Sequence, residues 1–119
     1  MIMIPVSVGE LYDKISILEI KKENGLTVDK ELKELNDIAN KLDSSLIVDY
    51  LKVQLHLVNQ QIWDNENDKR AAEKQKKFDD QFIAFGRAVY ILNDQRAQIK
   101  RTINDVTNSE IKEYKSHAK

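Results

Sequence analysis

The sequence predicts an all-α protein, an antiparallel bundle of about four helices with a short C-terminal helix and possibly a short N-terminal strand. Three observations lead to this prediction. Charged residues make up 33% of the chain, whereas glycine occupies three positions and proline one, a balance typical of long helices with solvated faces. Apolar residues recur at alternating steps of three and four along much of the chain, which places them on one side of a helix. Capping signals precede several of these stripes.

Length and composition restrict the classes of protein to consider. With 119 residues, the chain fits one helical domain over residues 1–119. A formal net charge of -1 gives no long-range attraction to phosphate backbones, so we expect no nucleic-acid partner. The absence of cysteine fits a cytoplasmic protein, and no apolar run approaches the roughly 20 residues that span a bilayer. We therefore expect a cytoplasmic protein with no membrane span.

The first helix has clear start and stop signals. Ser7 followed by Glu10 has the spacing of a capping box, and Gly25 is placed to end the helix in a left-handed conformation. The apolar stripe between these signals consists of Val8, Leu11, Ile15 and Leu18. Ahead of it, Ile2, Ile4 and Val6 alternate as in a short strand, which could also pair across a dimer.

The second and third helices follow without any glycine or proline between them. Thr27 is expected to cap the second helix, whose stripe consists of Val28, Leu32, Leu35, Ala39, Leu42 and Leu46. The third segment, from about Leu46 to Gln75, begins apolar nearly all round, which predicts burial on several sides. Its continuation DNENDKRAAEKQKK contains no large apolar residue, so this end of the helix should be solvated.

The fourth helix is predicted from about Asp80 to Asp105. Asp79 is its expected cap, with Phe78 and Ile83 at the staple positions. Asn108 and Ser109 are expected to cap the short final helix, SEIKEYKS. Because no glycine or proline occurs between residues 26 and 85, residues 46–105 are also compatible with one long helix that packs only in an oligomer. The restart of the pattern at Phe78 favours a hairpin.

An arginine interrupts the apolar stripe of the fourth helix. Arg96 stands between Leu92 and Ile99, where the spacing calls for an apolar side chain. One interpretation is an anion-binding site formed by donors of this helix, which are Arg87, Tyr90, Asn93, Arg96 and Lys100. The interpretation that we favour is structural: these donors pair with acids of neighbouring helices and hold the bundle in register. The candidate acids are Glu10, Asp13, Asp64 and Glu66.

No pattern indicates a metal, a cofactor or a catalytic nucleophile. Asp64, Glu66 and Asp68 alternate as in a calcium loop but lack its glycine and its distant glutamate. His56 and His117 are too far apart in sequence to form a paired zinc motif. We therefore predict no metal site and no cofactor, and we assign no catalytic residue.

Four stretches together resemble the DUF6165 family, a family of small bacterial proteins of unknown function. The stretches are PVSVGELYDKISILEIKK, LVNQQIWDNENDKR, FDDQFIAFGRAVYILNDQRAQIKRTIN and SEIKEYKS, so the resemblance runs from Pro5 to Ser116. It implies no established reaction. The matching polar positions include the candidate donors and acids named above, together with Lys14, Trp63 and Asp94.

Four apolar stripes and the all-round apolar start of the third helix exceed what a small monomer readily covers. We therefore expect a non-enzymatic module that self-associates as a homo-oligomer or docks on a protein partner. The alternative is a binder of, or an enzyme acting on, a small anionic metabolite such as a sugar phosphate or a nucleotide.

Overall fold

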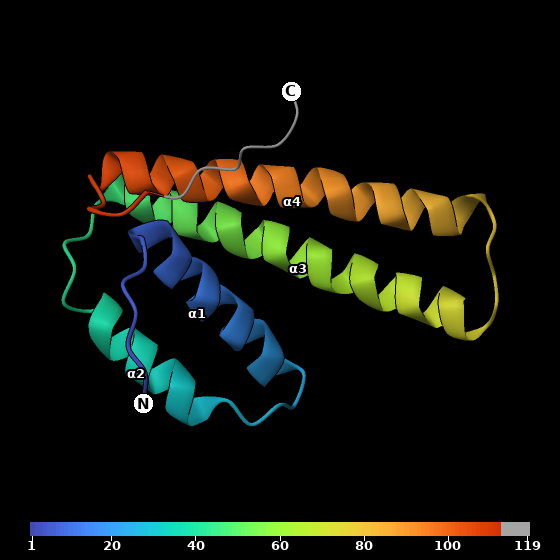
Figure 1. The fold of residues 1–119 in the computed structure, drawn as a ribbon, viewed down its shortest axis with the longest axis horizontal. Coiled ribbons are helices and arrows are strands. Elements are labelled where there is room, and N and C mark those ends of the chain that lie inside the picture. The colour runs from blue at the N-terminus through green and yellow to red at the C-terminus, as the bar shows by residue number, and fades with distance from the viewer. Residues whose placement is uncertain (113–119) are drawn as a thin grey trace.

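The computed structural model describes residues 1–112, which form four helices (Figure 1). The helices are α1 (Val8–Glu23), α2 (Asp29–Ala39), α3 (Leu46–Lys74) and α4 (Asp80–Val106). Together they confirm the predicted all-α fold. The short N-terminal strand that the sequence suggested is not present, and residues 1–7 have no regular secondary structure.

The helix α1 lies at the centre of the arrangement. It packs against each of the other three helices, α3 packs along α4, and no other pair of helices is in contact within residues 1–112. The core residues come from all four helices and are Leu11, Tyr12, Ile15, Leu18, Leu32, Val48, Leu51, Leu55 and Ile103. Since α2 contacts only α1, it leaves much of α3 uncovered.

Most helix starts follow the local capping signals. The side chains of Ser7 and Asp79 accept hydrogen bonds from the amides of Glu10 (3.0 Å) and Phe82 (3.1 Å), as predicted. Gly25 adopts the predicted left-handed conformation, with φ at +85°. The Thr27 prediction is wrong, because the residue that precedes α2 is Val28 and it makes no side-chain cap.

Residues 46–106 form a helical hairpin rather than one long helix. The helix α3 starts after Ser45, whose hydroxyl accepts from the Val48 amide at 3.2 Å. It ends in a Schellman motif, in which the amides of Lys77 and Lys76 donate to the carbonyls of Ala72 (2.8 Å) and Glu73 (3.1 Å). This motif reverses the chain, and the far end of the hairpin projects beyond α1 and α2 (Figure 1).

The residues after α4 cap α1 instead of forming the start of a further helix. The Ser109 hydroxyl, predicted to cap the final helix, accepts from the amide of Val8 (3.0 Å) and donates to the carbonyl of Ile111 (2.7 Å). Residues 109–112 are accordingly not helical, which corrects that part of the prediction. The remainder of SEIKEYKS lies outside the described residues.

The helices α1 and α4 approach each other closely at Gly9. Its amide donates to Asn104 Oδ1 at 2.7 Å, and a Cβ at this position would lie 2.5 Å from the carbonyl oxygen of Lys100. Asn104 is 2% exposed, so this contact is a buried one. Two of the free amides in the first turn of α1 are thus satisfied by side chains from the far end of the sequence.

Candidate functional site

Arg96 reaches across from α4 to Asp13 of α1. Its Nε donates to Asp13 Oδ1 at 2.9 Å, and its Nη2 contacts Asp13 Oδ2. This two-point geometry is the strong form of an arginine–carboxylate pair. The Asp13 side chain is fully buried, whereas 28% of the Arg96 side chain remains exposed.

A second cation lies one helical turn further along α4. Lys100 Nζ contacts Glu10 Oε2 at 2.5 Å and lies 3.6 Å from Asp13 Oδ2. Arg96 and Lys100 thus face the two carboxylates at the interface between α1 and α4, and Lys14 of α1 adds a third cation, with its Nζ 3.5 Å from Glu10 Oε1. We call Glu10, Asp13, Arg96 and Lys100 the ion-pair cluster.

Neutral polar side chains extend the cluster toward α3. Asn59 Nδ2 donates to Asp13 Oδ1 at 3.0 Å and lies 3.2 Å from Ser16 Oγ. The Ser16 hydroxyl also lies 2.8 Å from Nδ1 of His56. Since Ser16 and Asn59 are both buried, these bonds satisfy polar groups that would otherwise be costly to bury.

The ionised form of Asp13 is held by its partners. Burial by itself raises the pKa of this carboxyl. The hydrogen bonds from Arg96 and Asn59 and the charges of Arg96 and Lys100 outweigh burial, so the pKa lies below its ordinary value. For Arg96, the hydrogen bond to Asp13 raises the pKa further than burial lowers it. Both members of the pair are therefore charged at neutral pH.

The serine and the histidine do not form a nucleophilic relay. In such a relay the hydroxyl and the acid contact different nitrogens of the imidazole ring. Here Ser16 lies at Nδ1 of His56, and the nearest carboxylate, Glu19 Oε2, lies 3.7 Å from the same nitrogen. Among residues 1–112, no carboxylate therefore orients the His56 ring from the side opposite Ser16.

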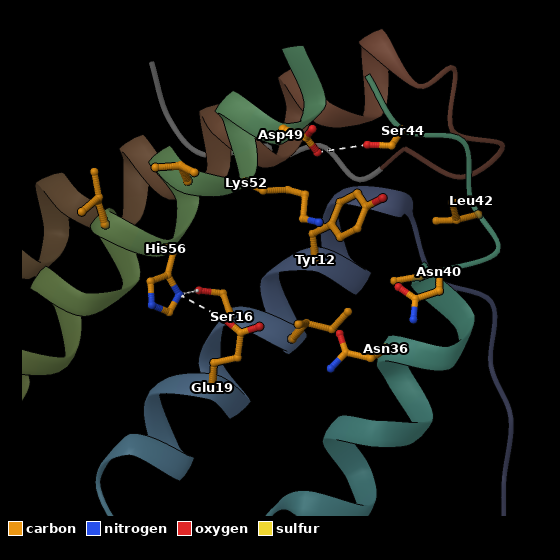
Figure 2. Close-up of a pocket in the computed structure, with 14 residues that line it drawn as sticks. Tyr12, Ser16, Glu19, Asn36, Asn40, Leu42, Ser44, Asp49, Lys52 and His56 are labelled. Carbon is orange, nitrogen blue, oxygen red and sulfur yellow. Dashed lines mark hydrogen bonds and ion pairs between the residues drawn. The ribbon is translucent and has the colours of Figure 1, made fainter. Parts of the chain in front are cut away.

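These residues border an open groove of about 610 Å³ between α2 and α3, with α1 as its floor (Figure 2). Ser16 and Glu19 of α1 point toward His56 of α3, while Asn36 of α2 and Asn40, which follows the last residue of α2, line the other side (Figure 2). The groove is mixed in character, because its apolar walls are formed by Ile15, Ala39, Leu42, Val53 and Leu57. The charged side chains that line the groove are those of Glu19, Asp49 and Lys52, so the groove has no excess of positive charge that would favour an anionic ligand.

A family model for the DUF6165 family of unknown function matches residues 2–119. The chain belongs to the DUF6165 family. The comparisons with curated proteins and with solved structures gave no match. The resemblance found in the sequence is thereby confirmed, and family membership of this DUF6165 chain assigns no reaction to it.

The structure brings together some of the candidate residues of the DUF6165 chain and separates others. Glu10, Asp13, Arg96 and Lys100 form the ion-pair cluster, and Asn93 Oδ1 lies 3.4 Å from Arg96 Nη1. The other four candidates are Arg87, Tyr90, Asp64 and Glu66.

Those four candidates do not join the cluster. Glu66 pairs with Lys69 (3.2 Å) and Arg70 (3.9 Å) of its own helix, and Asp64 accepts from Gln60 at 3.1 Å. Arg87 is exposed and makes no ion pair with any described residue. Tyr90 is 67% exposed. A site containing all five predicted donors is therefore not assembled among residues 1–112.

The sequence interpretation missed an exposed apolar face on α3. The start of this helix was expected to be buried on several sides, and this expectation is wrong. Only one side packs, through Val48, Leu51, Leu55 and Val58. The opposite side exposes Leu46 (90%), Tyr50 (61%), Val53 (57%) and Leu57 (51%), and Ile47 (55%) is exposed at the edge of the packed side. We call these five residues the outer face of α3.

Proposed function

We propose that this DUF6165 chain is a non-enzymatic helical module that self-associates through the outer face of α3. The observation that carries the proposal is the outer face itself, where five large apolar side chains are each more than half exposed. Contiguous exposed apolar residues of this kind are typical of protein interfaces. None of the helices in residues 1–112 is long and apolar enough to cross a membrane.

The spacing on the outer face fits a helix as the partner element. Leu46, Tyr50, Val53 and Leu57 follow steps of four, three and four, which is the spacing of a coiled-coil seam. None of the five outer-face residues is charged. Two copies that met through this face would bury no like charges along the seam, so a second copy is a suitable occupant.

The size of the exposed surface also favours association. The accessible surface is 8651 Å², whereas a compact monomer of 13.8 kDa would have roughly 6,600 Å². Likewise, the radius of gyration is 16.0 Å, against about 13.5 Å for a compact chain of this length. Part of the excess lies at Met1–Ile4, which are 73–100% exposed.

The alternative of a small anionic ligand receives less support from the same residues. Arg96 and Lys100 already face Asp13 and Glu10, so an incoming anion would have to displace a carboxylate from each cation. One of these carboxylates, that of Asp13, is fully buried and would be left without its charged partner. The proposal therefore assigns the ion-pair cluster a structural role.

The oligomeric state tests this proposal. We expect the wild-type protein to sediment as a dimer or larger species at micromolar concentration, and Tyr50→Glu/Val53→Glu to sediment as a monomer. Two carboxylates in the seam would have to be desolvated on association, which should weaken it by at least a hundredfold. Analytical ultracentrifugation provides the measurement. The matched control is Gln98→Glu, a charge added at an exposed position of α4, which should leave the dimer intact.

A monomeric wild-type protein at millimolar concentration would contradict self-association. An unchanged dimer in the double variant would show that another surface carries the association.

The two α3 helices are expected to pair in an antiparallel orientation. Beyond Leu57 the seam positions continue as Gln60 and Asp64, so a continued parallel seam would oppose two aspartates. An antiparallel seam places Leu46 opposite Leu57 of the partner subunit and leaves the polar positions outside. Because the chain has no cysteine, disulfide formation between single-cysteine variants distinguishes antiparallel from parallel pairing. Mixed Leu46→Cys and Leu57→Cys should form a heterodisulfide faster than either variant crosslinks to itself, and the reverse result would indicate parallel pairing.

A further inference from the structure

A pocket of about 320 Å³ lies where α1, α3 and α4 meet, and it shares no lining residue with the groove between α2 and α3. Its walls are apolar and consist of Ile17 and Ile20 from α1 and Ile62 and Trp63 from α3. Ile17, Ile62 and Trp63 are partly exposed, so this apolar surface is open to solvent. Small-molecule sites are typically pockets of about this size, mostly apolar, with a few polar groups that orient the ligand. We call it the Trp63 pocket.

Asn59, which lines the buried end of the Trp63 pocket, has a side-chain carbonyl without a protein partner. The ionised Asp13 carboxylate only accepts hydrogen bonds, so Asn59 has to present its amide nitrogen to Asp13. That nitrogen donates to Asp13 Oδ1 (3.0 Å) and to Ser16 Oγ (3.2 Å). Asn59 Oδ1 accepts no hydrogen bond from any of residues 1–112, although Asn59 is only 5% exposed. A ligand that donates a hydrogen bond to this oxygen would satisfy it.

Arg96 lines the same end of the pocket and has N–H groups that the protein does not use. A guanidinium carries five N–H donors. Arg96 uses two of them on Asp13 and one on Asn93 Oδ1, at 3.4 Å, which leaves two of the five. Arg96 Nε (2.9 Å) and Asn59 Nδ2 (3.0 Å) both donate to Asp13 Oδ1, so the two side chains are neighbours. The pocket therefore has hydrogen-bond donors and a carbonyl acceptor side by side at its buried end.

The charges that line the Trp63 pocket favour a neutral ligand. Each has a counter-ion within the protein, because Arg96 contacts Asp13 and Arg70 lies 3.9 Å from Glu66. A carboxamide has the required polar atoms, since its oxygen accepts from the guanidinium and its N–H donates to Asn59 Oδ1. A carboxylate would instead place a second acceptor beside Asn59 Oδ1, and an ammonium would place a cation beside the guanidinium. Hydrogen bonding therefore selects a group that both accepts and donates.

We propose that the Trp63 pocket binds a small neutral ligand with an apolar body and a carboxamide end. The body lies against Ile17, Ile62 and Trp63, and the carboxamide bonds to Arg96 and Asn59. The ligand uses N–H groups that Arg96 has left over, so no carboxylate is displaced and the ion-pair cluster keeps its structural role. The inference does not depend on self-association, because no residue of the outer face of α3 lines this pocket.

Fluorescence of the full chain tests the chemistry of the ligand, because Trp63 is its single tryptophan. We expect phenylacetamide to change the Trp63 emission saturably in the millimolar range. Phenylacetate and 2-phenylethylamine have the same apolar body with a different polar end, and each should bind about tenfold more weakly, because a buried polar group is then left unpaired. Absence of a response to phenylacetamide, or equal affinity for either of the other two probes, would overturn the proposal.

A pair of matched substitutions tests the location. Ile17→Phe enlarges a partly exposed side chain in the pocket wall and should weaken phenylacetamide binding about tenfold by narrowing the pocket. The control is Ile91→Phe, the same change at a position of α4 that is 49% exposed and does not line the pocket. Its affinity should equal that of the wild type. Equal affinities of the two variants would place the ligand elsewhere and overturn the proposal.

Nuclear magnetic resonance of the wild-type protein tests the location without a substitution. In proton–nitrogen correlation spectra, phenylacetamide should shift the side-chain signals of Asn59 and of Arg96 Nε–H. The matched controls are the side-chain amides of Asn36 and Asn40, which line the groove between α2 and α3 and should not move. Shifts confined to Asn36 and Asn40 would assign the ligand to that groove and overturn the proposal.

Discussion

Replacing Arg96 by methionine is expected to lower the free energy of unfolding by about 3–5 kcal/mol at neutral pH. The substitution leaves the fully buried Asp13 carboxylate without its two-point partner, and only Asn59 and the more distant Lys100 remain near it. For a chain of this size the melting temperature should fall by roughly 10–20 °C. Urea denaturation of wild type and variant measures the difference.

The matched control for this variant is Asp13→Leu/Arg96→Met. A buried ion pair replaced as a unit by apolar residues of similar size is often neutral for stability. We therefore expect the double variant to recover most of the loss. If it is as unstable as Arg96→Met alone, the packing of the arginine side chain, rather than the uncompensated carboxylate, carries the effect.

The loss of unfolding free energy in Arg96→Met should also depend on pH. In the wild type the pKa of Asp13 is lower in the folded than in the unfolded protein. Its contribution to stability is therefore fully present above the unfolded value of about 3.9 and is lost as pH falls through the folded pKa. In Arg96→Met, burial raises the pKa of Asp13, so protonation relieves the variant as the solution becomes acidic. The difference between the two proteins should begin to shrink while the pH is still above about 4, where Asp13 of the variant becomes protonated, and should shrink further below pH 4 as the wild type loses the contribution of Asp13; a constant difference would contradict this account.

Replacing Gly9 by alanine is expected to cost about 3 kcal/mol of unfolding free energy. The new Cβ would lie 2.5 Å from the backbone oxygen of Lys100 and 2.9 Å from Asn104 Oδ1. Backbone atoms of α4 cannot rotate away as a side chain can, so α1 must shift. That shift would break the buried hydrogen bond from the Gly9 amide to Asn104. Thermal and urea denaturation measure the loss.

Gly86 provides the matched control for the Gly9 substitution. It lies in the interior of α4, and a Cβ there would meet nothing within 4 Å. Gly86→Ala should therefore leave stability unchanged or raise it by up to about 1 kcal/mol, because alanine is the better helix former. If the two alanine variants were equally stable, close contact at Gly9 would not be what positions α1 on α4.

Local signals in the sequence were sufficient for most of the fold. The caps Ser7 and Asp79 and the left-handed Gly25 could be predicted, because each depends on residues within four positions along the chain. The hairpin was favoured for the same reason, since the pattern restarts at Phe78. The second helix was less predictable, because Val28 precedes it without a capping side chain and Thr27 offered a false signal.

The candidate site was only partly accessible from the sequence. Spacing identified Arg96 as an exception within an apolar stripe, but four acids were equally good partners. Asp13 is 83 positions away in sequence, and Arg96 reaches it because α1 packs on α4. Asp64 and Glu66 interact within α3 instead. The contacts of Asn104 and Ser109 with the start of α1 had no sequence signal, since they join residues about 100 positions apart.

The sequence by itself indicated the four main helices, favoured a hairpin over one long helix and identified the family of this chain, because these depend on neighbouring residues and on the pattern of the whole chain. The tertiary structure alone decided which side of α3 is buried. Apolar residues surround the start of that helix, so periodicity could not distinguish its two sides. The side is chosen by where α1 and α4 lie, and α2 does not cover the remainder because it packs on α1 alone. Long-range packing thus selected both the partner of Arg96 and the apolar surface left for association.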